Sequence, residues 1–235
     1  MIRRTLLTLP LAVAFVSCGP QGSPDRAGGL SPGAIDSGAP KLLPRDEADE
    51  SFRRFRGDLL AALGRRDTTF LFGVLAPDIR NSFGDLDSVS GFRRQWQPGE
   101  PGSPVWRSLT RLLELGGRLE DDTVFVAPYV YAFWPDTVDA FTHLAVTTLR
   151  AEVRSRPSPD APLMGTASLT ILQLAEWTGL HDRPTARDTV WARVVMPDGT
   201  RGWVRGDQVY SPIGWRGIFV RSEGRWRLSV LVAGD

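Results

Sequence analysis

The sequence has one cysteine, Cys18, and two histidines, His143 and His181. A single cysteine excludes an intrachain disulfide and a thiolate metal cluster. A zinc site needs three or four histidine, cysteine or carboxylate ligands at characteristic spacings, and the two histidines stand far apart in the chain. We therefore predict no metal site and no cofactor.

An excess of charge of one sign is also missing. The chain has 28 lysine and arginine residues against 27 aspartate and glutamate residues, which gives a formal net charge of +1. Nucleic-acid-binding proteins usually carry a concentrated basic excess that displaces counterions from phosphates. We therefore predict no nucleic-acid partner.

Motifs of the common catalytic sites are absent. The sequence has no Gly-x-Ser-x-Gly, no Walker loop, no Gly-x-Gly-x-x-Gly after a strand and no His-Glu-x-x-His. Glu120, Asp121 and Asp122 are consecutive acids before an expected strand, a pattern typical of a solvated loop. We therefore predict no catalytic residue and a protein that is not an enzyme.

Apolar runs near the N-terminus are too short for a membrane-spanning helix, which needs roughly 20 apolar residues. Residues 5–16 form a short apolar run after Arg3 and Arg4, and the small residue Ser17 follows it. This is the layout of a secretory signal.

The run ends in Phe15-Val16-Ser17-Cys18, which resembles the bacterial lipobox, with phenylalanine where leucine is usual. The resemblance implies that residues 1–18 are a lipoprotein signal peptide and that Cys18 is acylated. The protein would then be exported and lipid-anchored to a membrane of the cell envelope, the outer membrane or the periplasmic face in a Gram-negative host. The alternative is an ordinary signal peptide that is cleaved a few residues later.

Residues 19–45 are dominated by Gly, Pro, Ser, Ala and Asp and show no hydrophobic periodicity, so we expect a disordered tether. The rest of the chain has the composition of a folded protein, since the whole sequence is 42% hydrophobic and 23% charged. Its length allows two small domains.

Helices are expected first. Phe52, Phe55, Leu59 and Leu63 recur at spacings of three and four, which predicts an amphipathic helix over residues 46–63. A second helix is expected from the N-cap Asp67 to Pro77, and Phe92 and Trp96 suggest a further helical turn. The pair Ser103-Pro104 predicts another helix start, and Gly116-Gly117 its end.

Strands are expected next, over residues 124–134 and 140–146, and a final hairpin turns at Ser222-Glu223-Gly224. This order of elements resembles the NTF2-like (cystatin-like) α+β fold, in which a curved antiparallel sheet wraps a long helix. The resemblance implies a discontinuous domain made of residues 46–147 and 211–235. Tyr129 and Tyr131 would share one face of their strand and, with His143, could line a pocket; packing in the core is the other interpretation.

Residues 148–210 carry several spaced pieces of one pattern. Val153-Arg154-Ser155-Arg156-Pro157-Ser158, Trp191-Ala192-Arg193-Val194 and Gly202-Trp203-Val204 resemble strands of the bacterial SH3 (SH3b) domain. The resemblance implies a small all-β barrel, in which Asp198-Gly199 turns a hairpin and Gly202 lets strands approach closely. The charged loop of residues 176–190 is longer than usual in this family.

Trp191, Trp203 and Tyr210 could form an aromatic ligand groove or the core of this barrel. The SH3b resemblance implies a non-catalytic module that contacts peptidoglycan or an envelope protein. The alternative function is a small-molecule carrier or an isomerase or dehydratase that uses the pocket of the NTF2-like domain.

Overall fold

Two β-sheets and several helices build the part of the chain that the structure describes. The structure is a computed structural model and describes residues 33–82, 84, 86–178 and 190–234. The α+β class predicted from the sequence is confirmed. Cys18, His181 and most of the charged loop of residues 176–190 lie outside the described residues.

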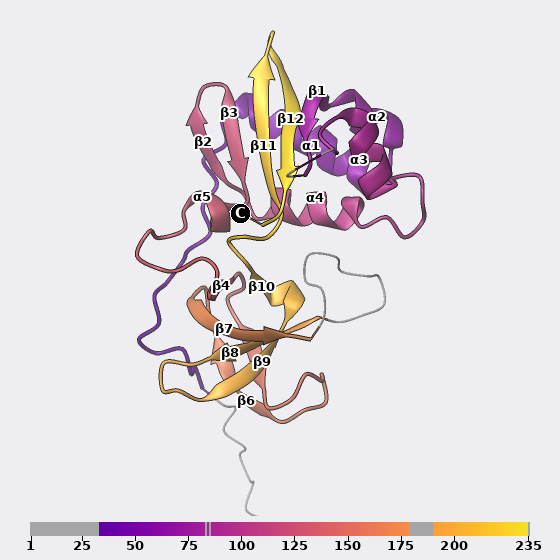
Figure 1. The fold of residues 1–235 in the computed structure, drawn as a ribbon. Coiled ribbons are helices and arrows are strands. Elements are labelled where there is room, and N and C mark those ends of the chain that lie inside the picture. Colours follow the sequence, from indigo (N-terminus) through magenta and orange to yellow (C-terminus); the bar gives the residue numbers. More distant parts are fainter. Residues whose placement is uncertain (1–32, 83, 85, 179–189, 235) are drawn as a thin grey trace, which may run out of the picture. The chain divides into compact units, whose positions relative to one another are not determined.

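The first sheet has the strand order β1-β12-β11-β3-β2 (Figure 1). Its strands are β1 (Leu75–Arg80), β2 (Arg118–Asp121), β3 (Val124–Ala127), β11 (Arg216–Ser222) and β12 (Arg225–Val232). The last two form the predicted C-terminal hairpin, and Glu223 and Gly224 turn it with positive φ angles. β1 pairs with β12 in parallel, so the prediction of an antiparallel sheet is wrong at this edge. The two strands are far apart in the sequence, and no hairpin turn fixes their direction.

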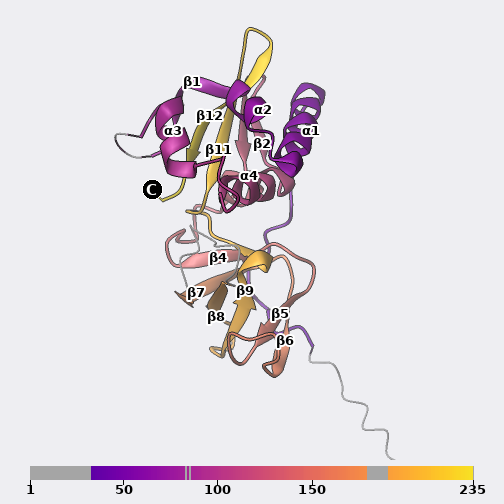
Figure 2. The same ribbon diagram turned by 90° about the vertical axis from the view of Figure 1, so that its right-hand side faces the viewer.

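Four helices accompany this sheet (Figure 2). They are α1 (Glu50–Arg65), α2 (Thr68–Gly73), α3 (Val89–Trp96) and α4 (Val105–Glu114). The predicted cap Asp67 is confirmed, because its side chain accepts a hydrogen bond from the Phe70 amide at 2.9 Å. Among the described residues, no helix has both the length and the apolar character that crossing a membrane requires.

α4 begins directly after the Ser103-Pro104 pair, as predicted, but the Ser103 side chain does not cap it. Its hydroxyl instead donates to the carbonyl oxygen of Trp96 at 2.6 Å, and Pro104 stands at the N-cap without a side-chain hydrogen bond. The last carbonyls of a helix have no partner within it, so Ser103 satisfies one of these groups at the end of α3.

The core of the first sheet is aromatic. Phe52 on α1 is fully buried, and its ring stacks on Phe125 of β3 with ring centroids 3.8 Å apart. Phe219 of β11 and Trp226 of β12 meet the same ring edge-on at 5.3 and 5.0 Å. The predicted face of α1 therefore packs on three strands of the sheet.

The strand expected over residues 124–134 ends early. β3 stops at Ala127, and the next residues form the short helix α5 (Tyr129–Ala132). Pro128 lies between them and has no amide hydrogen to donate to a neighbouring strand. The prediction that Tyr129 and Tyr131 share one face of a strand is therefore wrong.

The second sheet has the strand order β10-β4-β7-β8-β9-β5-β6. Its strands are β4 (His143–Val146), β5 (Ala151–Arg154), β6 (Leu163–Ala167), β7 (Ile171–Trp177), β8 (Trp191–Val195), β9 (Arg201–Arg205) and β10 (Val209–Tyr210). Figure 2 shows the long central strands β7, β8 and β9. The order is open, and among the described strands no pairing between β10 and β6 closes it into a barrel.

β4 belongs to the second sheet. The sequence pattern assigned residues 140–146 to the first sheet together with residues 124–134. In the structure β4 pairs with β7 and β10, for example Leu144 with Leu172. The second sheet therefore begins before residue 148, and that part of the domain prediction is corrected. The apolar pattern of a strand shows that it is half buried but does not show which sheet covers it.

Residues 33–42 are packed against the second sheet and do not form the predicted tether. The Ile35 amide donates to Thr166 of β6, and the Ile171 amide of β7 donates to Pro40. The buried Asp36 carboxylate accepts hydrogen bonds from the Lys41 ammonium at 2.7 Å and from the Ser168 amide at 3.0 Å. Burial raises the pKa of Asp36, and the hydrogen bonds to Lys41 and Ser168 outweigh burial and hold the pKa below its ordinary value.

Apart from Lys41, these partners are more than a hundred residues away in the sequence. Hydrophobic periodicity does not reveal these contacts, because residues 33–42 are held mainly by backbone groups, one carboxylate and the buried Leu42.

α4 and the second sheet are joined by a half-buried arginine. Nη2 of Arg111 donates to the carbonyl oxygens of Gly206, at 2.9 Å, and of Val209. Gly206 is the first residue of the short 3₁₀ helix η1 (Gly206–Gln208), and Val209 follows this helix. The guanidinium carbon of Arg111 lies 5.1 Å from the centre of the Tyr210 ring.

Candidate functional site

The residues expected to line a pocket of the NTF2-like domain, Tyr129, Tyr131 and His143, have different surroundings, and none of them lines the pocket described below. Tyr129 is fully buried in a cluster with Val130, Ala145 and Ile171. Tyr131 is 40% exposed, and the Arg216 guanidinium lies 4.9 Å from the centre of its ring.

The Tyr129 hydroxyl has no hydrogen-bond partner among the described residues. Burial raises the pKa of Tyr129 to about 12, so the phenol stays protonated near neutral pH. It is therefore a buried neutral group and not a base.

His143 opens β4 and is half buried. Its Nδ1 lies 3.0 Å from the Thr142 hydroxyl and 3.1 Å from the Asp139 carbonyl oxygen. The His143 ring therefore takes part in a local turn with Asp139 and Thr142. Among the described residues, no group of three or more His, Cys, Asp or Glu side chains could hold a metal ion.

Asp121, one of the three consecutive acids, also has a local role. Its Oδ1 accepts hydrogen bonds from the Thr123 amide and hydroxyl, both at 2.7 Å, in the turn between β2 and β3. These contacts lower the pKa of Asp121.

The three aromatic residues expected to form a groove on the second sheet have different surroundings. Tyr210 is buried, and its hydroxyl donates to the carbonyl oxygen of Trp215 at 2.5 Å. Burial raises the pKa of this phenol. Tyr210 therefore belongs to the core. Trp191 is buried, whereas Trp203 is half buried.

The register of the second sheet places Trp191 and Trp203 on one face. Trp191 pairs with Arg205, and Arg193 pairs with Trp203, in an uninterrupted ladder between β8 and β9. Directly paired residues project to the same face, so the two tryptophans are diagonal neighbours. The core of this sheet contains Ala192 and Val194, which alternate with them. Both indoles therefore lie on the face away from this core.

Charged side chains extend this outer face across four strands. Arg193 pairs with Glu176 of β7, and Trp203 pairs with Arg154 of β5. One row of side chains thus crosses the sheet, and we call it the Trp203 row. Its members are Glu176, Arg193, Trp203 and Arg154. The Arg193 guanidinium carbon lies 5.8 Å from the centre of the Trp203 ring. Trp203 was predicted as a groove residue, but its neighbours in the row were not, because the strand registers cannot be read from the motifs alone.

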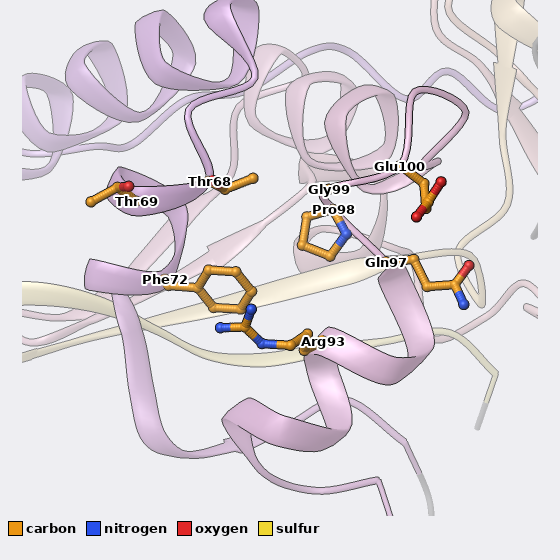
Figure 3. A pocket seen from close by; sticks show the side chains of 8 residues that line it. All are labelled: Thr68, Thr69, Phe72, Arg93, Gln97, Pro98, Gly99 and Glu100. Atoms are coloured by element: carbon orange, nitrogen blue, oxygen red, sulfur yellow. The ribbon is translucent and has the colours of Figure 1, made fainter.

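A pocket of about 490 Å³ lies elsewhere, beside the first sheet (Figure 3). It is formed by α2, by α3 and by the turn that follows α3. The lining residues are Thr68, Thr69, Phe72, Arg93, Gln97, Pro98, Gly99 and Glu100. None of them was singled out from the sequence, because polar residues at helix ends and in turns carry no pattern that marks a pocket.

The guanidinium carbon of Arg93 lies 4.2 Å from the centre of the Phe72 ring. Figure 3 shows the two side chains against each other, with Glu100 set apart from them. The pocket therefore presents one cation and one anion at separate places.

Comparisons with protein-family models, with curated proteins and with solved structures give no match for this chain.

Proposed function

We propose that the protein is a lipid-anchored, non-catalytic protein of the cell envelope whose second sheet is an SH3b-like module that binds peptidoglycan stem peptides. The Trp203 row carries this proposal, because a half-buried indole between two arginines can bind an extended peptide that has free carboxylates. The indole offers an apolar surface, and the Arg193 guanidinium offers paired donors for a carboxylate. Arg154 already donates to the Ala161 carbonyl and to Glu152, so its contribution is positive charge beside the indole.

The local geometry of the second sheet supports the SH3b-like assignment. Gly199 has a φ of +85° in the turn between β8 and β9, the conformation expected of the Asp198-Gly199 turn. A Cβ atom on Gly202 would lie 2.3 Å from Cγ1 of Val153. Glycine therefore permits the close approach of β9 to β5, as the resemblance implies.

Glu176, the one acid of the row, does not block a ligand. Glu176 lies 3.4 Å from Arg193, and both side chains are substantially exposed. An exposed ion pair contributes at most about 1 kcal/mol. A ligand carboxylate can therefore replace Glu176 at Arg193 at little cost.

For the first sheet we propose an NTF2-like fold. The packing of α1 on β3, β11 and β12 supports it, since this fold places a long helix against the sheet. The parallel pairing of β1 is a departure from the expected antiparallel sheet.

Trp203→Ala is expected to weaken binding to purified sacculi about tenfold, the loss typical of a central aromatic residue at a peptide interface. The experiment is co-sedimentation of the full-length chain carrying Cys18→Ser, which removes the lipidation site. The segment before α1 is kept because residues 33–42 pack on the second sheet. Arg193→Gln should weaken binding as well, since it removes the donor to the carboxylate.

Arg225→Gln is the control, because it removes one exposed arginine from the hairpin of the first sheet. If the unchanged chain does not sediment with sacculi, the peptidoglycan proposal is wrong. If it sediments and Trp203→Ala sediments equally well, the site is not the Trp203 row. If chains with an intact Trp203 row capture an envelope protein and Trp203→Ala does not, the partner of the row is that protein and not peptidoglycan.

The anchor is tested separately. Expression with labelled palmitate should label the unchanged chain and leave Cys18→Ser unlabelled, because acylation needs the thiol. The connection between anchor and folded part would be residues 19–32, which span at most about 50 Å when fully extended. Equal labelling of both chains, or labelling of neither, would contradict the anchor.

A further inference from the structure

We propose that the pocket between α2 and α3 binds a small zwitterion, a free amino acid or a short peptide with both termini uncapped. Its volume of about 490 Å³ lies in the range of small-molecule sites. This site is independent of the Trp203 row and of the proposed function.

Arg93 supplies a cation that is held in place and still able to donate. Its guanidinium lies over Phe72, and a contact through the flat face leaves the N–H groups at its edges free. Among the described residues no carboxylate lies within ion-pair distance of Arg93, whereas Arg154 and Arg193 each have one. A ligand carboxylate can therefore take the edge of Arg93.

Glu100 supplies the opposite charge. Its carboxylate lines the same pocket and, within the described part of the chain, forms no ion pair or side-chain hydrogen bond. A simple anion would leave this carboxylate facing the ligand without a donor. A ligand that carries an ammonium as well as a carboxylate matches both charges, and this selects a zwitterion.

The remaining lining is suited to a small polar molecule. Thr68 and Thr69 contribute hydroxyls, and no hydrogen bond of their side chains to another described residue is formed. Pro98 and Phe72 supply apolar surface for a short side chain. The ligand therefore meets hydrogen-bonding groups and an apolar wall within one pocket.

Gln97 stands where glycine would be the favourable residue. It is the C-cap of α3 with a φ of +44°, in the left-handed region that glycine adopts at low cost. We assign its amide to hydrogen bonding with the ligand. Gln97→Gly should therefore raise the thermal midpoint of the protein and, at the same time, weaken ligand binding at least threefold.

The test is calorimetric titration of the full-length chain with alanyl-alanine, with its N-acetyl form and with its C-terminal amide. The uncapped dipeptide should bind saturably in the millimolar range, and each cap should weaken binding about tenfold, the loss expected for one charge-assisted hydrogen bond. Arg93→Gln should bind the dipeptide and its amide equally weakly. Glu100→Gln should no longer distinguish the N-acetyl form.

Arg94→Gln is the matched control, because Arg94 is an exposed neighbour on α3 that does not line the pocket. It should bind alanyl-alanine like the unchanged chain. The proposal is overturned by absence of saturable binding, by equal binding of capped and uncapped forms, or by equal effects of Arg93→Gln and Arg94→Gln. A Gln97→Gly chain with unchanged affinity would overturn the assignment of Gln97.

Discussion

Phe52→Ala is expected to lower the free energy of unfolding by about 4 kcal/mol, within the range of large-to-small changes in a packed core. Phe52 is fully buried, and its ring contacts Phe125, Phe219 and Trp226 on three different strands. The change removes these aromatic contacts and leaves a cavity that one strand cannot fill without moving the others. Urea unfolding followed by tryptophan fluorescence measures the loss.

Phe55→Ala is the matched control on the same helix. Phe55 is only partly buried, and its ring meets Phe52 at 5.7 Å and Phe219 at 5.9 Å. Its removal should cost about half as much, since part of the side chain already faces water. A loss below about 1 kcal/mol for Phe52→Ala, or equal losses for the two variants, would contradict the central place of Phe52.

The inner face of α1 was predictable because the helical period places Phe52, Leu59 and Leu63 on one side, and all three are buried. Asp67 was predictable because a side-chain oxygen before a helix satisfies an amide that has no partner in the helix. The C-terminal hairpin followed from alternation and from its short turn. Each of these features depends on residues close together in the sequence.

Features with distant partners were missed. Residues 129–132 have a composition that favours strands. However, Pro128 ends β3, and these residues form the short helix α5. The prediction assigned β4 to the wrong sheet, because the alternation of apolar and polar residues does not identify the partner strand. The Arg93 pocket depends on the approach of α2 to the end of α3, which no local pattern shows.

Arg111→Met is expected to lower the free energy of unfolding by about 2 to 3 kcal/mol. The methionine keeps much of the aliphatic volume and removes the donors to the Gly206 and Val209 carbonyls. A hydrogen bond from a charged donor contributes about 1.5 to 3 kcal/mol, and a buried acceptor left without a donor adds a cost. Urea unfolding measures the total effect.

Arg111 is half buried, and this burial lowers its pKa. The guanidinium nevertheless remains charged at neutral pH, because arginine is protonated throughout the range in which proteins fold. The Gly206 and Val209 carbonyls and the face of the Tyr210 ring therefore replace water molecules that would otherwise hydrate this cation. Arg111→Lys should recover only part of the stability, since an ammonium lacks the planar donor geometry of the guanidinium.

Arg111 also connects α4, whose apolar face lies in the core of the first sheet, with η1 and β10 of the second sheet. Arg111→Met should therefore speed hydrogen exchange at the amides of residues 206–210 more than at those of β11. Arg94→Met makes the same change of charge at an exposed position and should alter neither stability nor exchange. Equal effects of the two variants would show that loss of positive charge, and not loss of this contact, determines the outcome.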